Sequence, residues 1–271
     1  MDAIRLAVIG GAGKIGSALI DGLIASGRVA PENITATARH EASLEPLSRH
    51  GVHTTTDNVA ATAGAEVVIL AVHPDETAEA MAQLRPGLRA EQLLITIVTG
   101  VGTARIEQMA GQALPIVRAN PNIAVLVAES ATVLCRGAHA TAAHLDLARS
   151  LFATVGLVEV LDERHMNAST GLGGCGPAFI FKILEAMAEG GVKMGLPRDV
   201  ARSISAQVMK GAAELILRTG KHPAAFKDEV TTPGGCTIDG IAKLQERGIS
   251  IALIDAVEVS TRKAGALWGD G

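Results

Sequence analysis

The sequence predicts a chain of the α/β class, in which a doubly wound parallel sheet is followed by an all-helical domain. Up to about residue 162, short apolar runs of strand length alternate with helical patterns, and this alternation favours a parallel sheet covered by helices. Beyond that point, long alanine-rich helical patterns follow one another. Hydrophobic residues make up 48% of the 271 residues, which is enough for sizeable cores. We therefore expect domains at 1–162 and 163–271.

The strands of the first domain are expected where apolar residues run continuously, because such strands are buried on both faces. Between these runs, apolar residues recur at helical spacing. We expect strands at 4–9, 33–36, 67–72, 93–98, 116–117, 132–135 and 158–161, and helices from Ile15, over 43–50, from about Thr103 and over 142–154.

The second domain is expected to consist of helices over 179–192, 197–217, 224–228, 238–247 and 251–267. Pro197 suits the first position of its helix. The pattern over 198–218 carries small and apolar residues on most faces, which is more apolar surface than a domain of this size hides by itself. We therefore expect a homo-oligomer formed through these helices; the alternative is a central helix in a monomeric bundle.

Composition excludes several classes of protein. The net charge is −4 and no long basic block occurs, so nucleic acid is a poor candidate partner. The longest apolar runs are far shorter than a membrane span, and the first strand begins too near Met1 for a signal peptide. The three cysteines are far apart, which argues against a disulfide framework or a metal site and favours a reducing, cytoplasmic setting.

A glycine-rich loop lies between the first strand and the first helix. Its spacing is Gly11-x-Gly13-x-x-Gly16. Gly11 is expected to form the sharp turn, Gly13 to let backbone N–H groups approach a pyrophosphate, and Gly16 to pack the helix on the strand. The phosphate would lie at the helix N-terminus. We interpret the loop as a dinucleotide-binding loop of a Rossmann-type domain; the alternative is a turn that binds nothing.

The end of the second strand indicates which dinucleotide is bound. Arg39 stands there, 23 residues after Gly16, and no carboxylate lies between the end of the strand and Glu41. A guanidinium holds a ribose 2′-phosphate by charge-assisted hydrogen bonds, and Thr37 offers a hydroxyl beside it. We therefore expect NADPH. In the alternative, Arg39 is a solvated charge, Glu41 binds the ribose and NADH is used.

A second glycine-rich segment lies in the helical part. Thr232 is expected to cap a helix that begins at Pro233, and the glycines after it leave backbone N–H groups uncovered. Such a helix start offers a site for a small carboxylate, with the Thr237 hydroxyl one turn further on. Segment 173–177 repeats the pattern, with glycines before Pro177. The alternative for both segments is close packing of helices at glycine.

Several segments match the motifs of one family. Residues 170–179 read TGLGGCGPAF, residues 190–198 read GGVKMGLPR and residues 230–238 read VTTPGGCTI. Shorter matches occur at 71–74 (AVHP), 222–223 and 227–228. On these motifs the chain resembles the pyrroline-5-carboxylate reductases over nearly its whole length.

The resemblance implies that Δ1-pyrroline-5-carboxylate is reduced to L-proline by hydride from NADPH. It also implies a helical C-terminal domain that interlocks with that of another subunit, in a homodimer or a larger ring. A cyclic imine is already electrophilic, so the enzyme must chiefly align the hydride donor and hold the carboxylate. No strong acid–base pair is required, and none is visible in the sequence.

The resemblance also implies a set of site residues. Thr237 would hydrogen-bond the imine nitrogen and is the expected catalytic residue. The residues expected at the substrate are Val230, Thr232, Gly235, Cys236 and Thr237. The residues expected at the cofactor are Gly11, Gly13, Lys14, Ile15, Thr37, Arg39, Asn58, Ala71, Val72, His73, Pro74 and Asn122. No metal ion is expected.

Several positions depart from the family pattern. The family's RxMPNTP segment is RANPNIA here, at 118–124, with Asn122 kept. His73 and Lys14 replace a usual lysine and a usual asparagine, and Cys175 and Cys236 replace small residues. These departures leave two alternatives open, namely a reductase of a different cyclic imine carboxylate and a non-catalytic NADP-binding paralogue.

Overall fold

A computed structural model describes residues 4–266. Its internal contacts divide the chain into two compact units, which we call unit 1 (Met1–Cys175 with Val259–Gly271) and unit 2 (Gly176–Glu258). The change in composition near residue 162 does not coincide with this division. The short helix α7 (Met166–Ser169) packs on strand β7 and so belongs to the sheet unit.

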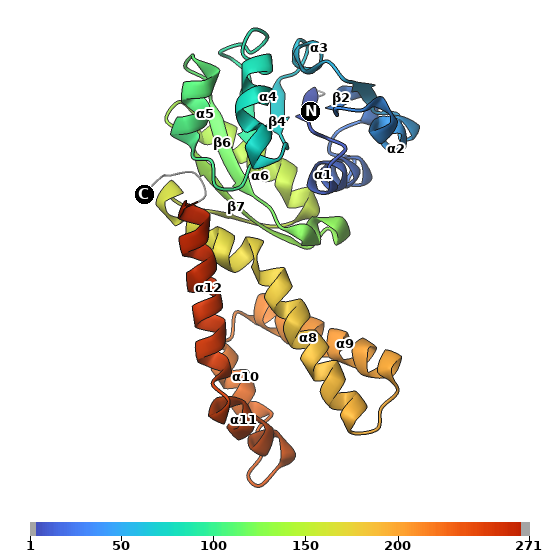
Figure 1. The fold of residues 1–271 in the computed structure, drawn as a ribbon, viewed down its shortest axis with the longest axis vertical. Helices are drawn as coiled ribbons and strands as arrows, with labels where there is room; N and C mark the ends of the chain where they lie inside the picture. Colours follow the sequence, from blue (N-terminus) through green and yellow to red (C-terminus); the bar gives the residue numbers. More distant parts are fainter. Residues whose placement is uncertain (1–3, 267–271) are drawn as a thin grey trace. The chain divides into compact units, whose positions relative to one another are not determined.

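Unit 1 is built on an eight-stranded sheet with the strand order β3-β2-β1-β4-β5-β6-β7-β8 (Figure 1). The order reverses at β1, so that β2 and β4 flank the first strand, as in a doubly wound sheet. The strands are β1 (Leu6–Ile9), β2 (Ile34–Thr37), β3 (His53–Thr55), β4 (Val67–Leu70), β5 (Leu93–Thr96), β6 (Ile116–Asn120), β7 (Ser130–Arg136) and β8 (Gly156–Val160).

One pairing differs from the expected parallel sheet. Strands β6 and β7 are antiparallel, whereas every other pairing is parallel. The connection between them is the short 3₁₀ turn Ile123–Val127, which is too short for a parallel crossover. The chain therefore reverses its direction at this point, and the end of β6 lies beside the start of β7.

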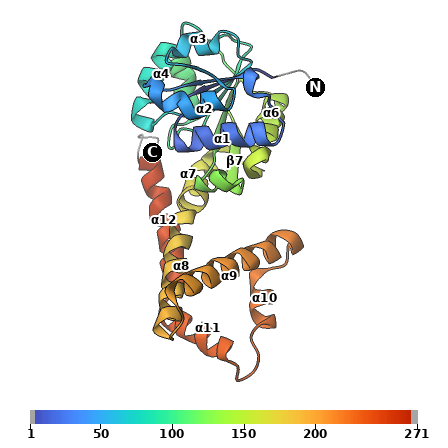
Figure 2. The same cartoon turned by 90° about the vertical axis from the view of Figure 1, so that its right-hand side faces the viewer.

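Helices cover both faces of the sheet (Figure 2). Helices α1 and α6 contribute Leu19, Leu23 and Phe152 to the core on one face, and α4 and α5 contribute Met81 and Ile106 to the core on the other. The helices other than α7 are α1 (Lys14–Ala25), α2 (Glu45–Arg49), α3 (Asn58–Thr62), α4 (Thr77–Leu84), α5 (Thr103–Ala110) and α6 (Ala142–Phe152).

Unit 2 is helical, as expected. It contains α8 (Gly176–Lys193), α9 (Arg198–Thr219), α10 (Pro223–Glu229) and α11 (Cys236–Glu246), and helix α12 (Ile249–Ala266) leads back into unit 1. Pro197 precedes α9 in an extended conformation and does not form its first turn. The last expected helical residue, 267, lies outside the described residues.

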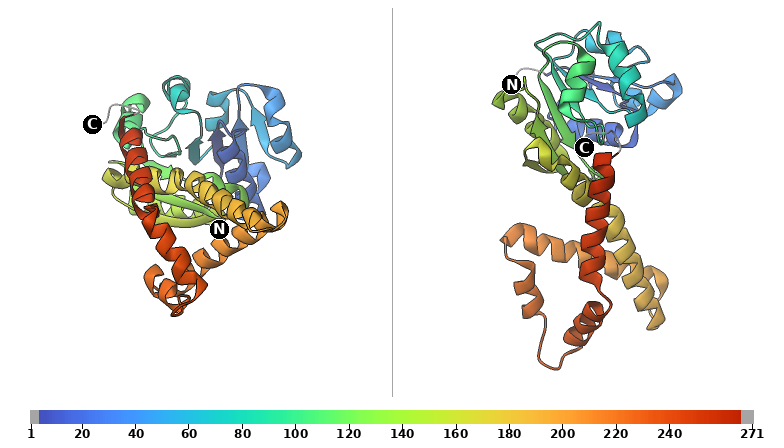
Figure 3. Two further views of the ribbon diagram at one scale, coloured as in Figure 1. Left: turned by 60° about the horizontal axis from the view of Figure 1, so that its bottom comes forward. Right: turned by 60° about the vertical axis from the view of Figure 1, so that its left-hand side comes forward.

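Unit 2 buries little apolar surface of its own. Helices α8 and α9 pack against each other and cross at an angle (Figures 2 and 3), yet among their residues only Ala188, Ala201 and Ser205 are buried. Large apolar side chains on these helices, including Phe181 and Leu217, stay exposed. Such faces are typical of a surface covered by another subunit. Within residues 4–266, no helix is long and apolar enough to cross a membrane.

Candidate active site

The glycine loop connects β1 to α1, as the sequence predicts. The turn spans Gly10 to Gly13, because Gly13 N donates to Gly10 O at 3.0 Å, so Gly11 lies inside the turn as expected. Gly10 opens the turn with a φ of +78°, and a Cβ there would lie 2.7 Å from the carbonyl oxygen of Ala71. Gly11 is also needed for packing, because a Cβ there would lie 2.9 Å from the Cβ of Ala36. Gly13 precedes α1 with no side-chain cap, so the N-terminus of α1 faces the loop uncovered.

A cavity of about 250 Å³ lies next to this loop, at the ends of β1, β2 and β4. Its wall is held by a chain of hydrogen bonds that begins at Thr37. The Thr37 hydroxyl accepts from Gly10 N at 3.2 Å and donates to Asn58 Oδ1 at 2.7 Å. Asn58 Nδ2 in turn donates to Gln83 Oε1 at 2.7 Å. The residues that line the cavity are Ile9, Gly10, Thr37, Ala38, Arg39, Thr56, Asn58, Val72, Glu76, Glu79, Ala80 and Gln83.

Arg39 lines this cavity and forms an ion pair with Glu76. The Arg39 side chain is 66% exposed, so a ligand in the cavity has access to it. Glu41, the alternative ribose ligand, does not line the cavity. The sequence did not single out Glu76, which ends the turn after β4, or Glu79, which lies in the first turn of α4. The sequence offers one signal for them: Pro74, in the AVHP match, predicts a turn after a central strand, and acidic residues follow this proline.

The remaining residues expected at the cofactor lie around the same end of the sheet. Ala71 N donates to Ile9 O at 2.8 Å, which fixes the 71–74 segment beside the glycine loop. His73 precedes the turn Pro74–Glu76, with its Nδ1 3.3 Å from an Asp75 carboxylate oxygen. Lys14 is exposed at the first position of α1, and Ile15 packs against the core.

Asn122 lies past the end of β6, where its side chain forms two hydrogen bonds. Its Nδ2 donates to Gly173 O at 3.0 Å, and its Oδ1 accepts from Ala124 N at 3.0 Å. Asn120, which the sequence reading did not single out, donates from Nδ2 to the hydroxyls of Ser169 and Thr170 at 2.9 and 3.1 Å. The two amides thus tie the end of β6 to the glycine segment that begins at Thr170. A cofactor contact of Asn122 stays a prediction.

The helix start expected at Pro177 is confirmed, because α8 begins at Gly176 and Pro177 lies in its first turn. A π-helical turn, Thr170–Gly174, precedes α8, and Cys175 N donates to Thr170 O at 2.9 Å. The N–H of Cys175 is therefore bonded within the chain, and an anion site at this segment stays a prediction. Such π turns inside helices are frequent at functional sites.

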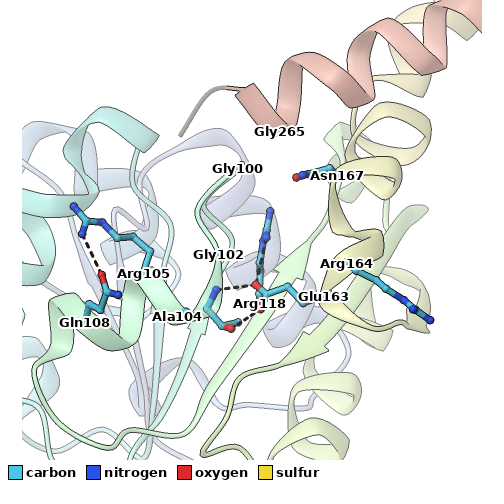
Figure 4. A pocket seen from close by; sticks show the side chains of 11 residues that line it. Gly100, Gly102, Ala104, Arg105, Gln108, Arg118, Glu163, Arg164, Asn167 and Gly265 are labelled. Atoms are coloured by element: carbon cyan, nitrogen blue, oxygen red, sulfur yellow. Dashed lines mark hydrogen bonds and ion pairs between the residues drawn. The ribbon is translucent and has the colours of Figure 1, made fainter. Parts of the chain in front are cut away.

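Glu163 lines a second cavity, of about 330 Å³, together with Gly100 and Gly102 (Figure 4). Its carboxylate accepts from Thr103 N at 2.7 Å and from the Thr103 hydroxyl at 2.5 Å, and so caps helix α5. The same carboxylate lies 3.4 Å from Nη1 of Arg118, whose side chain is only 6% exposed. Burial, followed by the charge of Glu163, raises the pKa of the neighbouring Cys135 thiol to about 12, so this thiol stays neutral at physiological pH.

We expect Glu163→Gln to lower the free energy of unfolding by about 1–2 kcal/mol, because it leaves the buried Arg118 guanidinium without a counter-charge. Chemical denaturation measures this change. Glu159→Gln, at an exposed position of β8, is the matched control and should have little effect. Equal stability of the two variants would show that the ion pair contributes nothing.

The loop before α11 differs from the expected cap. Helix α11 begins at Cys236, with Gly235 in the capping position, whereas Pro233 and Gly234 form a preceding turn. Gly235 N donates to Thr232 O at 3.0 Å, and a side chain at 235 would collide with the Thr232 hydroxyl. Thr237 is the second residue of α11 and is half-buried. The predicted helix start therefore exists, but it lies three residues later than expected.

The rest of the expected substrate segment belongs to the same loop. Val230 follows α10 and is 62% exposed, and Cys236 is an exposed free thiol. Gly235 carries no side chain that could bond the N-terminal N–H groups of α11, and no side-chain cap is formed there. The backbone at 235–236 is thus placed to accept an anion.

Comparisons with known proteins identify the family. A family model described as pyrroline-5-carboxylate reductase dimerisation matches residues 163–267, and one described as NADP oxidoreductase, coenzyme F420-dependent, matches residues 5–100. A pyrroline-5-carboxylate reductase of Methanosarcina acetivorans is 42% identical over 91% of this chain and 92% of its own length. The corresponding protein of Arabidopsis thaliana is 35% identical over 94% and 92%.

Solved structures agree with this assignment. A pyrroline-5-carboxylate reductase from Coxiella burnetii superimposes with a TM-score of 0.91 at 32% identity, over 97% of this chain and 98% of that one. A Plasmodium falciparum pyrroline carboxylate reductase, solved with NADP bound, has a TM-score of 0.87 at 26% identity, over 98% of both chains. The chain therefore belongs to the pyrroline-5-carboxylate reductase family.

Proposed function

We propose that the protein reduces Δ1-pyrroline-5-carboxylate to L-proline with hydride from NADPH. The observation that carries the proposal is the loop before α11, where Gly235 leaves the first turn of the helix uncapped and Thr237 stands half-buried inside it. This loop offers backbone donors for a carboxylate and a hydroxyl for the ring nitrogen, which are the two polar features of the substrate. The glycine loop and the cavity at Arg39 supply the complementary site for the cofactor.

The residues around the glycine loop fit a dinucleotide. The uncapped N-terminus of α1 follows Gly13, where no side chain covers the helix start, so it is suited to a pyrophosphate. Arg39 is exposed in the neighbouring cavity and is suited to a 2′-phosphate. When bound, NADPH supplies the hydride for the imine carbon.

The chain's own residues perform the remaining tasks. The imine is most electrophilic when its nitrogen is protonated, so the protein needs a group that holds the N–H rather than a strong acid. The Thr237 hydroxyl would accept from that N–H, while the backbone at Gly235 and Cys236 would donate to the carboxylate. Val230 and Thr232 would border the ring. The rate acceleration comes chiefly from the alignment of the nicotinamide with the imine carbon.

A substrate series tests the proposal. Purified protein is mixed with NADPH or NADH and with cyclic imine carboxylates of five- and six-membered rings, and the loss of nicotinamide absorbance is followed. We expect the highest kcat/KM for pyrroline-5-carboxylate with NADPH. A higher value for a six-membered ring would favour the alternative imine reductase. No turnover above a control without enzyme, on any imine, would identify a non-catalytic paralogue.

The family assignment supports a homo-oligomer, and we propose that it assembles through the helices of unit 2, as a homodimer or a ring of dimers. The exposed apolar side chains of α8 and α9 support this proposal. We propose residues 1–162 as the cofactor-binding part and 163–271 as the substrate-binding and dimerisation part. We propose the cytoplasm as the location and no nucleic acid as partner.

A further inference from the structure

Arg39, the residue proposed to bind the 2′-phosphate, already has an acidic partner. Its guanidinium forms an ion pair with the carboxylate of Glu76, and both side chains line the same cavity. Glu76 ends the turn Pro74–Glu76 directly before α4, so its backbone is fixed by the end of β4. The carboxylate therefore stands in the cavity itself and not on a distant surface.

Charge makes this arrangement unfavourable for a 2′-phosphate. A phosphate that approaches Arg39 must displace the Glu76 carboxylate from the guanidinium and must then tolerate its negative charge nearby. Glu79 lines the same cavity and adds to the negative charge. A ribose with a free 2′-hydroxyl meets neither cost, because the ion pair between Arg39 and Glu76 stays intact.

We propose that Glu76 sets the cofactor selectivity of this enzyme by competing with the 2′-phosphate for Arg39. With NADH bound, Glu76 holds Arg39 as its counterion. With NADPH bound, the phosphate takes the place of Glu76. The preference for NADPH is therefore smaller than Arg39 alone would give, and the enzyme accepts both cofactors. This inference rests on the proposed use of NADPH and names the residue that limits it.

The test compares the dissociation constants of NADPH and NADH, measured by the change in nicotinamide fluorescence, for the native protein and for Glu76→Gln. Since the ion pair is exposed, we expect NADPH to bind about 3- to 10-fold more tightly to the variant, and NADH to bind with an affinity changed by less than about twofold. The matched control is Glu41→Gln. Glu41 is an exposed carboxylate two residues after Arg39 that does not line the cavity, and its removal should leave the ratio of the two constants unchanged.

A third variant shows whether the effect passes through Arg39. In an Arg39→Gln background, Glu76→Gln should tighten NADPH binding by only about twofold or less. The reason is that no guanidinium is left for which Glu76 and the 2′-phosphate could compete. An unchanged ratio in Glu76→Gln, weaker NADPH binding in that variant, or an equal gain in Glu41→Gln would each overturn the role of Glu76. Failure of the native protein to bind NADPH at all would instead overturn the proposed cofactor and this inference with it.

Discussion

Replacing Thr237 with alanine is expected to lower kcat for pyrroline-5-carboxylate by about 10²-fold, the usual cost of removing one hydrogen bond that is strongest in the transition state. Thr237 lies in the first turn of α11, two residues after the uncapped Gly235, and so belongs to the same helix start as the backbone groups proposed to hold the carboxylate. The variant should keep its fold and its NADPH affinity, because the proposed cofactor residues belong to unit 1. Steady-state kinetics and cofactor titration measure the two effects separately.

Thr219→Ala provides the matched control for this variant. Thr219 also belongs to unit 2, but its hydroxyl donates to Leu215 O within α9 and accepts from Lys221 N at 3.2 Å. Its loss should leave kcat nearly unchanged. If Thr237→Ala turned over as fast as Thr219→Ala, Thr237 would have no part in the reaction.

Charge reversal at Arg39 is expected to have the second large effect. Arg39→Glu should weaken NADPH binding by about 10²-fold and NADH binding by only a few-fold, because only NADPH carries the 2′-phosphate that the guanidinium would hold. The new carboxylate would also stand beside Glu76 and Glu79 in the same cavity, which further disfavours a phosphate. Dissociation constants for both cofactors measure the difference.

Arg49→Glu reverses a charge of the same kind outside this cavity. Arg49 is exposed on α2 and pairs with Glu45. Its reversal should change the binding of both cofactors only slightly. A loss of affinity in Arg39→Glu that is equal for NADPH and NADH would contradict a 2′-phosphate site at Arg39.

Local patterns account for the features that the sequence predicted well. The apolar run at 67–72 predicts β4, and the glycine loop predicts the turn between β1 and α1, because each depends on neighbouring residues alone. The exposed apolar face of α9 follows in the same way from the pattern of small and apolar residues at 198–218. The family motif at 230–238 indicates a helix start, which the structure has at Cys236, and the substrate contacts expected there stay predictions.

Long-range contacts account for the features that the sequence reading missed or misplaced. Position 10 must be glycine because Ala71, which lies 61 residues further along the chain, approaches it just past the end of β4. Glu163 caps α5 and pairs with Arg118 across 60 and 45 residues of sequence. Glu76 reaches Arg39 only because β2 and β4 flank β1. No local spacing marks any of these pairs, so a single sequence offers no signal for them.

The most direct test of the proposed reaction is the transfer of deuterium from cofactor to product. The protein is incubated with pyrroline-5-carboxylate and with NADPH deuterated at both C4 positions of the nicotinamide, and the product is examined by mass spectrometry and NMR. We expect L-proline that carries a single deuterium on C5, because in the proposed reaction hydride passes directly from the nicotinamide to the imine carbon. Proline without deuterium at C5, or no proline at all while the Methanosarcina acetivorans relative forms it under the same conditions, would contradict the proposed reaction.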